Sequence, residues 1–313
     1  MLNQSIPISR IWFKDLENSP IDWEHFELSK IYDMRLRPKK TLQDHQSEAI
    51  TNVINGLKEQ DRGKLIMACG TGKTFTSLRL MERFVPPSGR VLFLAPSISL
   101  ISQSLREWTA EAIKPIHAFV VCSDTKVGQE EDIPIHDLAY PATTNAEKLI
   151  QNLRMCTRDR PTVIFSTYQS IQVIAEAQKL NFGEFDLIIC DEAHRTTGLT
   201  LPYEHPSDFV KVHDNEVIRG KKRIYMTATP RIFCEASKNR ANESAASLFS
   251  MDDEKIFGKE FYHLGFGKAV ELNLLSDYKV LIIAVKESEM AKLTNSFNNA
   301  YKIEEKKAIN VNF

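Results

Sequence analysis

The chain has 313 residues, 42% of them hydrophobic, which is enough apolar material for the core of one large domain or two modest ones. Its formal net charge of −1 excludes a protein that binds nucleic acid through overall basic charge, so any such contact must come from a local patch. The five cysteines include no C-x-x-C pair, which argues against a structural zinc site and for a reducing compartment.

The first 36 residues contain Trp12, Phe13, Trp23 and Phe26 among polar residues, and we expect a lead-in segment, 1–36, that packs its aromatic side chains on a core. We find no signal peptide and no apolar run long enough to cross a bilayer, so we expect a cytoplasmic protein with no membrane partner.

A basic stretch, residues 35–40, comes next, and it is either a solvated loop or a contact for a phosphate backbone. From Gln43 the apolar residues recur at helical spacing, which predicts a helix that ends near Gly56.

A glycine-rich turn is the clearest motif. Residues 64–74 read Lys-Leu-Ile-Met-Ala-Cys-Gly-Thr-Gly-Lys-Thr, an apolar run followed by a turn and then by a helical pattern. The general phosphate-loop pattern, G-x-x-x-x-G-K-S/T, has glycine where this chain has Met67. An ordinary glycine-rich turn is the alternative, but the strand before it and the helix after it favour a phosphate loop.

Such a loop binds a triphosphate through converging backbone N–H groups and the positive end of a helix. Gly70 and Gly72 allow the backbone to come close, and Thr71 lies between them. We expect Lys73 to reach the β- and γ-phosphates of ATP and the Thr74 hydroxyl to bind Mg²⁺.

Further short apolar runs are continuous rather than alternating, which is typical of parallel strands buried on both faces. They lie at residues 91–95, 119–122, 163–165, 187–190, 224–226 and 280–284. Helical patterns between several of them predict an α/β fold with a mainly parallel sheet. The segment 124–160 breaks this rhythm, and we expect a surface insertion with a helix near 145–156.

Polar or small residues follow many of these runs, and in a parallel sheet they all meet at the edge where ligands bind. Asp191 and Glu192 follow one run directly. We expect Asp191 to hold Mg²⁺ and Glu192 to orient and deprotonate the attacking water. A strand-ending acidic turn without function is the alternative. His194 is expected to connect the ATP site to Thr227 or Thr229, or simply to pack, rather than to transfer protons.

These motifs, in this order, resemble the first RecA-like domain of superfamily-two DEAH-type helicases and translocases over about residues 37–285. The resemblance implies a RecA-like (P-loop NTPase) sheet with helices on both faces and ATP hydrolysis coupled to movement on nucleic acid. It places Gln46 near adenine, although Gln43 stands where arginine is usual, and it makes Thr227 and Thr229 the link between phosphate state and domain movement. The residues that it implies for the nucleic-acid backbone are Pro96, Ser97, Thr167, Tyr168 and Gln169.

Longer segments are similar to the translocase domain of type ISP restriction-modification enzymes. They are residues 121–126, 191–198, 212–216 and 223–232. In that family one polypeptide joins a nuclease, two RecA-like domains, a methyltransferase and a target-recognition domain, and the motor tracks along duplex DNA. The resemblance therefore implies DNA as the partner.

Residues 1–36 are too short for the nuclease, and no Gln/Gly/Arg motif follows Pro230. We therefore expect residues 286–313 to be a linker or the truncated start of a second RecA-like domain. Because the missing arginine is worth roughly 10³–10⁵ in turnover, we expect the isolated chain to bind ATP weakly and to hydrolyse it poorly. Two alternatives stay open, an RNA helicase motor and a non-hydrolysing nucleotide-binding regulatory module, although Glu192 weighs against the second.

Overall fold

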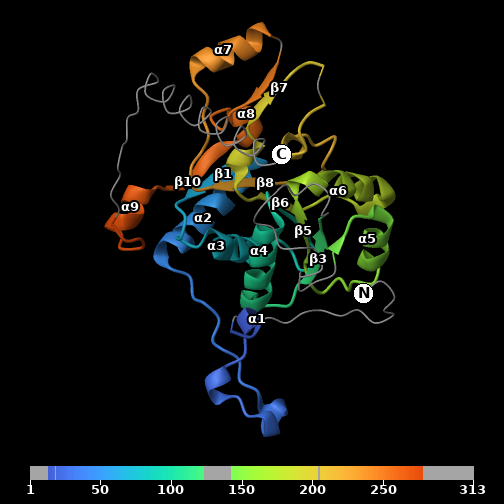
Figure 1. Ribbon diagram of the computed structural model, residues 1–313, viewed down its shortest axis with the longest axis vertical. Coiled ribbons are helices and arrows are strands. Elements are labelled where there is room, and N and C mark those ends of the chain that lie inside the picture. The colour runs from blue at the N-terminus through green and yellow to red at the C-terminus, as the bar shows by residue number, and fades with distance from the viewer. Residues whose placement is uncertain (1–12, 18, 123–141, 204, 245, 278–313) are drawn as a thin grey trace, which may run out of the picture. The chain divides into compact units, whose positions relative to one another are not determined.

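A single parallel sheet organises the part of the chain that the computed structural model describes, which is residues 13–17, 19–122, 142–203, 205–244 and 246–277. The chain divides into a unit of residues 1–275 and a unit of residues 276–313, and only Ser276 and Asp277 of the second are described. Within the described ranges the sheet has eight strands in the order β10-β1-β8-β6-β2-β5-β3-β4, all paired in parallel (Figure 1).

The strands of this sheet are β1 (Arg62–Met67), β2 (Arg90–Ala95), β3 (His117–Val121), β4 (Ala142–Thr143), β5 (Thr162–Thr167), β6 (Leu187–Cys190), β8 (Arg223–Thr227) and β10 (Lys259–Leu264). A separate antiparallel pair is formed by β7 (Gly198–Thr200) and β9 (Ser247–Phe249). The α-helices are α1 (Phe13–Glu17), α2 (Asp44–Glu59), α3 (Lys73–Phe84), α4 (Ile98–Glu111), α5 (Ala146–Leu153), α6 (Ile171–Ala177), α7 (Glu235–Glu243), α8 (Glu254–Phe257) and α9 (Phe266–Glu271). None of the helices in the described ranges combines the length and the apolar character that a bilayer crossing requires.

Two hydrophobic clusters cover the two faces of the sheet, and β2 shows how. Val91 and Phe93 belong to the cluster that includes α2, α3 and α4, whereas Leu92 and Leu94 belong to the cluster that includes α5 and α6. Alternate residues of a strand point to opposite faces, so a continuous apolar run is buried on both. The predicted α/β sheet with helices on both faces is confirmed.

Two strands of the sheet, β4 and β10, were not predicted from the sequence. The segment Lys-Glu-Phe-Tyr-His-Leu forms β10, which pairs with β1 at the end of the strand order. An edge strand has solvent on one side, and its polar residues hide the apolar pattern. The strand predicted at 280–284 lies outside the described residues.

The segment 124–160 is integrated into the fold where it is described. β4 pairs in parallel with β3, and Ala146 and Leu149 of α5 are buried in the cluster around α6. The predicted helix near 145–156 is therefore present as α5. The remainder of the predicted insertion, residues 123–141, lies outside the described residues.

The lead-in aromatic residues do not pack on the core, contrary to the prediction. Phe13 is 74% exposed, and Trp23 contacts Phe26 edge-on with ring centroids 5.0 Å apart rather than joining either cluster. Polar contacts hold this segment instead, since the Arg37 guanidinium donates to the main-chain carbonyls of Ile21 and Glu17. Trp12 lies outside the described residues.

Candidate nucleotide site and nucleic-acid interface

The phosphate loop connects β1 to α3, as the sequence predicts. Gly70 and Gly72 both have left-handed backbone conformations, with φ of 83° and 85°. A Cβ at Gly72 would lie 2.4 Å from Nε2 of Gln46, so this position also needs glycine for space. The turn brings its backbone to the start of α3, where the first N–H groups of the helix have no intrahelical partner.

Two side chains at the start of helix α2 contact the backbone of this loop. Nε2 of Gln46 donates to the carbonyl of Thr71 at 3.2 Å, and Nε2 of His45 lies 3.0 Å from the same oxygen. Both side chains are buried, and Oε1 of Gln46 accepts the N–H of Gln43. Gln46 is thus positioned against the phosphate loop. Sequence reasoning missed His45, and the only available signal was its place beside Gln46 at the start of a helix.

Lys73 and Thr74 open α3. The Lys73 ammonium donates to the carbonyl of Met67 at 3.2 Å, so its side chain curls over the turn. The carbonyl of Thr74 accepts from the indole of Trp108 at 3.2 Å, which ties α3 to α4.

Asp191 and Glu192 lie at the same edge of the sheet as this loop. β6 is separated from β1 only by β8, and all three strands are parallel, so their carboxyl ends are adjacent. Asp191 is 6% exposed, and burial together with the Glu192 charge raises its pKa to about 6 against the opposing effect of the Lys73 ammonium. The phosphate loop and the acidic pair therefore lie at one edge of the sheet.

The Glu192 carboxylate contacts His194, and His194 in turn contacts the first threonine of the Thr-Ala-Thr-Pro motif. Its φ is 48°, a left-handed conformation that is uncommon for residues other than glycine and is often found at functional turns. Oε2 of Glu192 lies 3.3 Å from Nδ1 of His194, and the same nitrogen lies 3.0 Å from Oγ1 of Thr227. Because a carboxylate only accepts, Nδ1 carries the proton when it contacts Glu192.

Thr227 continues this connection to Thr229. The Thr227 hydroxyl lies 3.2 Å from the Thr229 carbonyl and 3.3 Å from its N–H. Burial lowers the pKa of His194, which favours the neutral ring. The contact between His194 and Thr227, one of the alternatives considered from the sequence, is present; its role in coupling stays a prediction.

The five residues predicted for the nucleic-acid backbone separate into two groups. Pro96, Ser97 and Gln169 are partly exposed, and Nε2 of Gln169 donates to the carbonyl of Pro96 at 3.1 Å. These residues follow β2 and β5, which are paired through Ala95 and Thr167. They form one surface, which we call the strand-end strip.

Thr167 and Tyr168 are not part of this surface. The Thr167 hydroxyl donates to Oγ of Ser170 at 3.2 Å, and the Tyr168 hydroxyl donates to the main-chain carbonyl of Asp191 at 2.9 Å. Both side chains are buried. The prediction that the Tyr168 side chain contacts nucleic acid is therefore wrong, because its phenol packs in the core and stacks on Phe209. Tyr168 instead supports the acidic pair from the interior of the domain.

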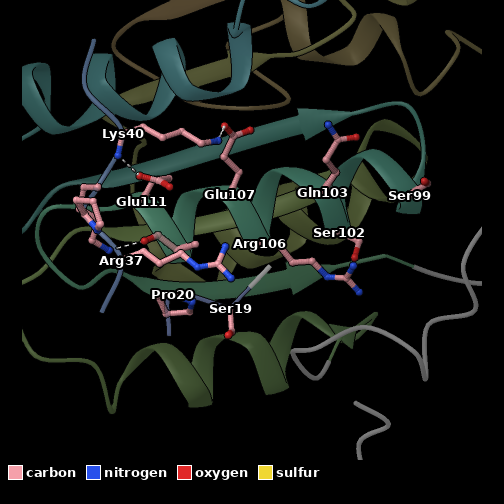
Figure 2. Close-up of a pocket in the computed structure, with 13 residues that line it drawn as sticks. Ser19, Pro20, Arg37, Lys40, Ser99, Ser102, Gln103, Arg106, Glu107 and Glu111 are labelled. Carbon is pink, nitrogen blue, oxygen red and sulfur yellow. Dashed lines mark hydrogen bonds and ion pairs between the residues drawn. The ribbon is translucent and has the colours of Figure 1, made fainter. Parts of the chain in front are cut away.

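The basic stretch 35–40 docks on α4 (Figure 2). Nζ of Lys40 pairs with Glu107 at 3.0 Å, the N–H of Lys40 donates to Glu111 at 2.8 Å, and Lys39 donates to the carbonyl of Ala110. A cavity of about 710 Å³ lies between this stretch and α4. The two glutamates offset part of its basic charge, so Lys39 and Lys40 mainly attach the N-terminal segment to the domain.

A second support lies behind the acidic pair, in the segment 212–216. Nε2 of the buried His213 lies 2.9 Å from the Thr196 carbonyl, and Nδ1 lies 3.0 Å from the hydroxyl of Tyr225. Burial lowers the pKa of His213 to about 4, so the ring is neutral and accepts from Tyr225 while it donates to Thr196. The fully buried Arg223 donates to the carbonyl of Val212 at 2.9 Å and so holds this segment on β8.

Comparison with known proteins agrees with this geometry. The family described as type III restriction enzyme, res subunit (ResIII) matches residues 39–232, more than half of the chain. A probable helicase of African swine fever virus is 26% identical over 284 residues, which cover 88% of this chain and 28% of the viral protein. The chain thus spans less than a third of that relative.

Two solved structures are also similar. The ATP-dependent type ISP restriction-modification enzyme LlaBIII, bound to DNA, is 44% identical with a TM-score of 0.71 over 85% of this chain and 18% of that one. A nuclease-deletion mutant of the type ISP enzyme LlaGI, in complex with a DNA substrate mimic, is 42% identical with a TM-score of 0.60 over 75% of this chain and 21% of that one. The RecA-like fold, the phosphate loop beside the acidic pair and the family match lead to one conclusion: the chain belongs to the ResIII family of restriction-enzyme res subunits and is a helicase-like motor domain of the ATP-using kind.

Proposed function

We propose that this chain hydrolyses ATP to drive movement along duplex DNA, as the motor domain of a restriction-modification enzyme. The observation that carries the proposal is that the phosphate loop after β1 and the acidic pair after β6 lie at the same edge of the sheet, with only β8 between the two strands. A loop for a triphosphate beside two carboxylates is the arrangement that nucleotide hydrolysis needs.

Each residue of this edge has a proposed role. Backbone N–H groups of residues 70–74 bind the phosphates, Lys73 binds the β- and γ-phosphates, and Glu192 orients and deprotonates the attacking water. The Thr74 hydroxyl and the Asp191 carboxylate are oxygen donors of the type that Mg²⁺ prefers, and the buried carboxylate beside a second carboxylate favours a cation there. When bound, Mg²⁺ offsets the phosphate charge. Gln46 is proposed to contact adenine while it positions the loop.

His194 and the threonines that follow β8 are proposed to transmit the state of the nucleotide. Nδ1 of His194 lies within reach of both Glu192 and Thr227. A change in the charge or position of Glu192 during hydrolysis therefore shifts the hydrogen bonds of Thr227 and Thr229.

DNA is the proposed track because both type ISP enzymes similar to this chain are described with DNA. The strand-end strip offers hydroxyl, amide and main-chain groups, which suit backbone contacts that do not depend on sequence. We propose residues 37–285 as the first RecA-like domain. A second RecA-like domain is the proposed partner that supplies an arginine to the γ-phosphate. Nuclease and methyltransferase domains are further proposed partners, and the cytoplasm is the proposed location.

The variant Glu192→Gln tests this function. It should retain ATP binding and lose hydrolysis by about 10²-fold or more, because the amide cannot accept a proton. Lys73→Ala should instead lose ATP affinity. Glu184→Gln, at an exposed position, is the matched control and should leave both quantities unchanged.

ATP affinity is measured by titration of this chain, and hydrolysis by single-turnover phosphate release, with and without duplex DNA. Because the chain alone is expected to turn over slowly, the same variants are also measured in a polypeptide that includes a second RecA-like domain. ATP binding without hydrolysis in the wild-type polypeptide, with no effect of Glu192→Gln on ATP affinity, would indicate a regulatory nucleotide-binding module. A wild-type rate of hydrolysis in Glu192→Gln would contradict the role of Glu192. Stimulation by RNA and not by duplex DNA would indicate the RNA motor.

A further inference from the structure

A second basic surface lies at the opposite edge of the sheet. A groove of about 580 Å³ opens where β2 and β5 begin, at Arg90 and Thr162, which are paired with each other. Since the strands are parallel, this edge is the far one from the phosphate loop. The other walls come from the connection between α5 and β5 and from the residues after α6. We call this surface the arginine groove, and its polar lining is Ser88, Arg90, Arg154, Thr157, Arg158, Arg160, Thr162 and Asn181.

The positive charge of the arginine groove is offset only in part by neighbouring acidic residues. Its lining contains four arginines and neither Asp nor Glu. Arg160 pairs with the exposed Asp159 at 3.4 Å, whereas Arg154 and Arg158 have no ion-pair partner within the described ranges. The cavity beside α4 differs in this respect, because Glu107 and Glu111 lie among its basic residues.

The guanidinium of Arg90 is held in place at the groove by its packing against neighbouring residues. It lies over the ring of Phe182, 5.2 Å from the centroid. Gly183 follows Phe182 with φ of 91°, and a Cβ there would lie 2.6 Å from a terminal nitrogen of Arg90. The nearby Asp186 carboxylate already accepts from Lys221 at 2.7 Å and from the main-chain N–H of Arg90 at 2.9 Å. The guanidinium of Arg90 is therefore held by packing rather than by an acid.

We propose that the arginine groove binds the phosphodiester backbone of nucleic acid, as a contact surface separate from the strand-end strip. Guanidinium groups donate in a planar fork that matches two phosphate oxygens, and hydroxyl and amide groups add further donors. An acidic peptide would also present carboxylates, but its main-chain N–H groups need acceptors, and the side chains of the lining supply only hydroxyls and the Asn181 amide oxygen. The inference rests on the proposed function in taking nucleic acid as the ligand.

The test compares DNA binding by this chain with that of Arg154→Ala/Arg158→Ala. A fluorescein-labelled duplex of about 30 base pairs is titrated at several salt concentrations, and anisotropy gives the dependence of affinity on salt. The loss of two phosphate contacts should weaken binding and lower the salt slope by about 2, irrespective of the DNA sequence. Arg240→Ala/Lys259→Ala removes two exposed cations outside the groove and should leave the slope unchanged.

A second variant changes the groove without changing the charge. Gly183→Ala displaces the guanidinium of Arg90 and should also weaken DNA binding. Circular dichroism shows whether each variant is folded, and only folded variants are compared.

The possible outcomes distinguish failure of the groove alone from failure of the groove together with the proposed function. An unchanged affinity and slope in Arg154→Ala/Arg158→Ala, with weaker binding in Ser97→Ala/Gln169→Ala, would overturn the groove and leave the motor intact. An equal loss of DNA affinity in the groove variant and in the Arg240→Ala/Lys259→Ala control would mean that only the net charge matters. That result would also overturn the groove. Binding of poly-glutamate but not of DNA in the groove would assign it to an acidic protein partner. A wild-type chain that binds no duplex even at low salt would overturn both proposals.

Discussion

The hydroxyl of Tyr168 donates to the main-chain carbonyl of Asp191 across 2.9 Å in the interior of the domain. Tyr168 is followed directly by Gln169 of the strand-end strip, and Asp191 carries one of the carboxylates of the nucleotide edge. One buried hydrogen bond therefore connects the surface proposed for DNA with the site proposed for ATP. Burial raises the pKa of Tyr168 well above its usual value, so the phenol stays protonated and continues to donate.

Tyr168→Phe removes this hydrogen bond and keeps the ring. We expect the free energy of unfolding to fall by about 1 kcal/mol, since a buried carbonyl loses its donor. Urea denaturation followed by fluorescence measures the change. Tyr203→Phe, at a fully exposed position, is the control. Equal stability of the two variants would mean that the hydrogen bond contributes nothing.

His213 is expected to be a positioning residue for the segment that follows the acidic pair. His213→Leu removes the donor to Thr196, and we expect it to lower kcat for ATP hydrolysis, measured with a second RecA-like domain present. His213→Gln places an amide N–H near the position of Nε2 and should restore part of the loss. If His213 only stabilised the fold, variants His213→Leu and His213→Gln of equal stability would have equal kcat. The free energy of unfolding of both variants is therefore measured in parallel.

The neutral state of His213 predicts how stability depends on pH. Its pKa is about 4 in the folded chain, against about 6.5 when exposed, so the unfolded chain binds the extra proton first. The contribution of the neutral His213 to the free energy of unfolding is fully present above about pH 6.5. It is lost as pH falls, and below about pH 4 the total loss is about 3 kcal/mol.

Asp191 acts in the opposite direction, because its pKa is raised to about 6 and its proton favours the folded chain as pH falls. The measurement is therefore the difference in unfolding free energy between the wild-type chain and His213→Gln, from pH 4 to pH 7. A difference that is constant across this range would contradict the burial of a neutral His213.

Gly72→Ala should impair nucleotide binding. The left-handed conformation costs alanine about 1–2 kcal/mol, and the new Cβ meets the Gln46 amide that positions the loop. ATP affinity, measured by titration, should fall by about tenfold or more. Gly267→Ala, in α9, has no atoms near its Cβ and no positive φ, and it should leave affinity unchanged. Equal affinities for the two variants would contradict the role of the turn.

The sequence predicts this fold where burial imposes a pattern. The continuous run of β2 is apolar because both of its faces are covered, and the phosphate loop is recognisable because its glycines are conformationally required. Prediction was limited where the environment of a residue depends on segments that are distant in the sequence. β10 is polar at an edge, and Tyr168 looks like a surface residue until β5 and β6 bring its hydroxyl beneath Asp191. His45 and His213 act through carbonyls that only the fold brings near.

The neighbours of β1 affect how the domain forms during synthesis. β1 carries the phosphate loop and is translated early, but it pairs with β8 and β10, which emerge from the ribosome much later. Contacts between distant parts of a chain form slowly because the intervening segment must first be ordered. The nucleotide edge therefore completes among the last features of the domain, and the apolar face of β1 needs protection in the nascent chain until Leu264 has been added.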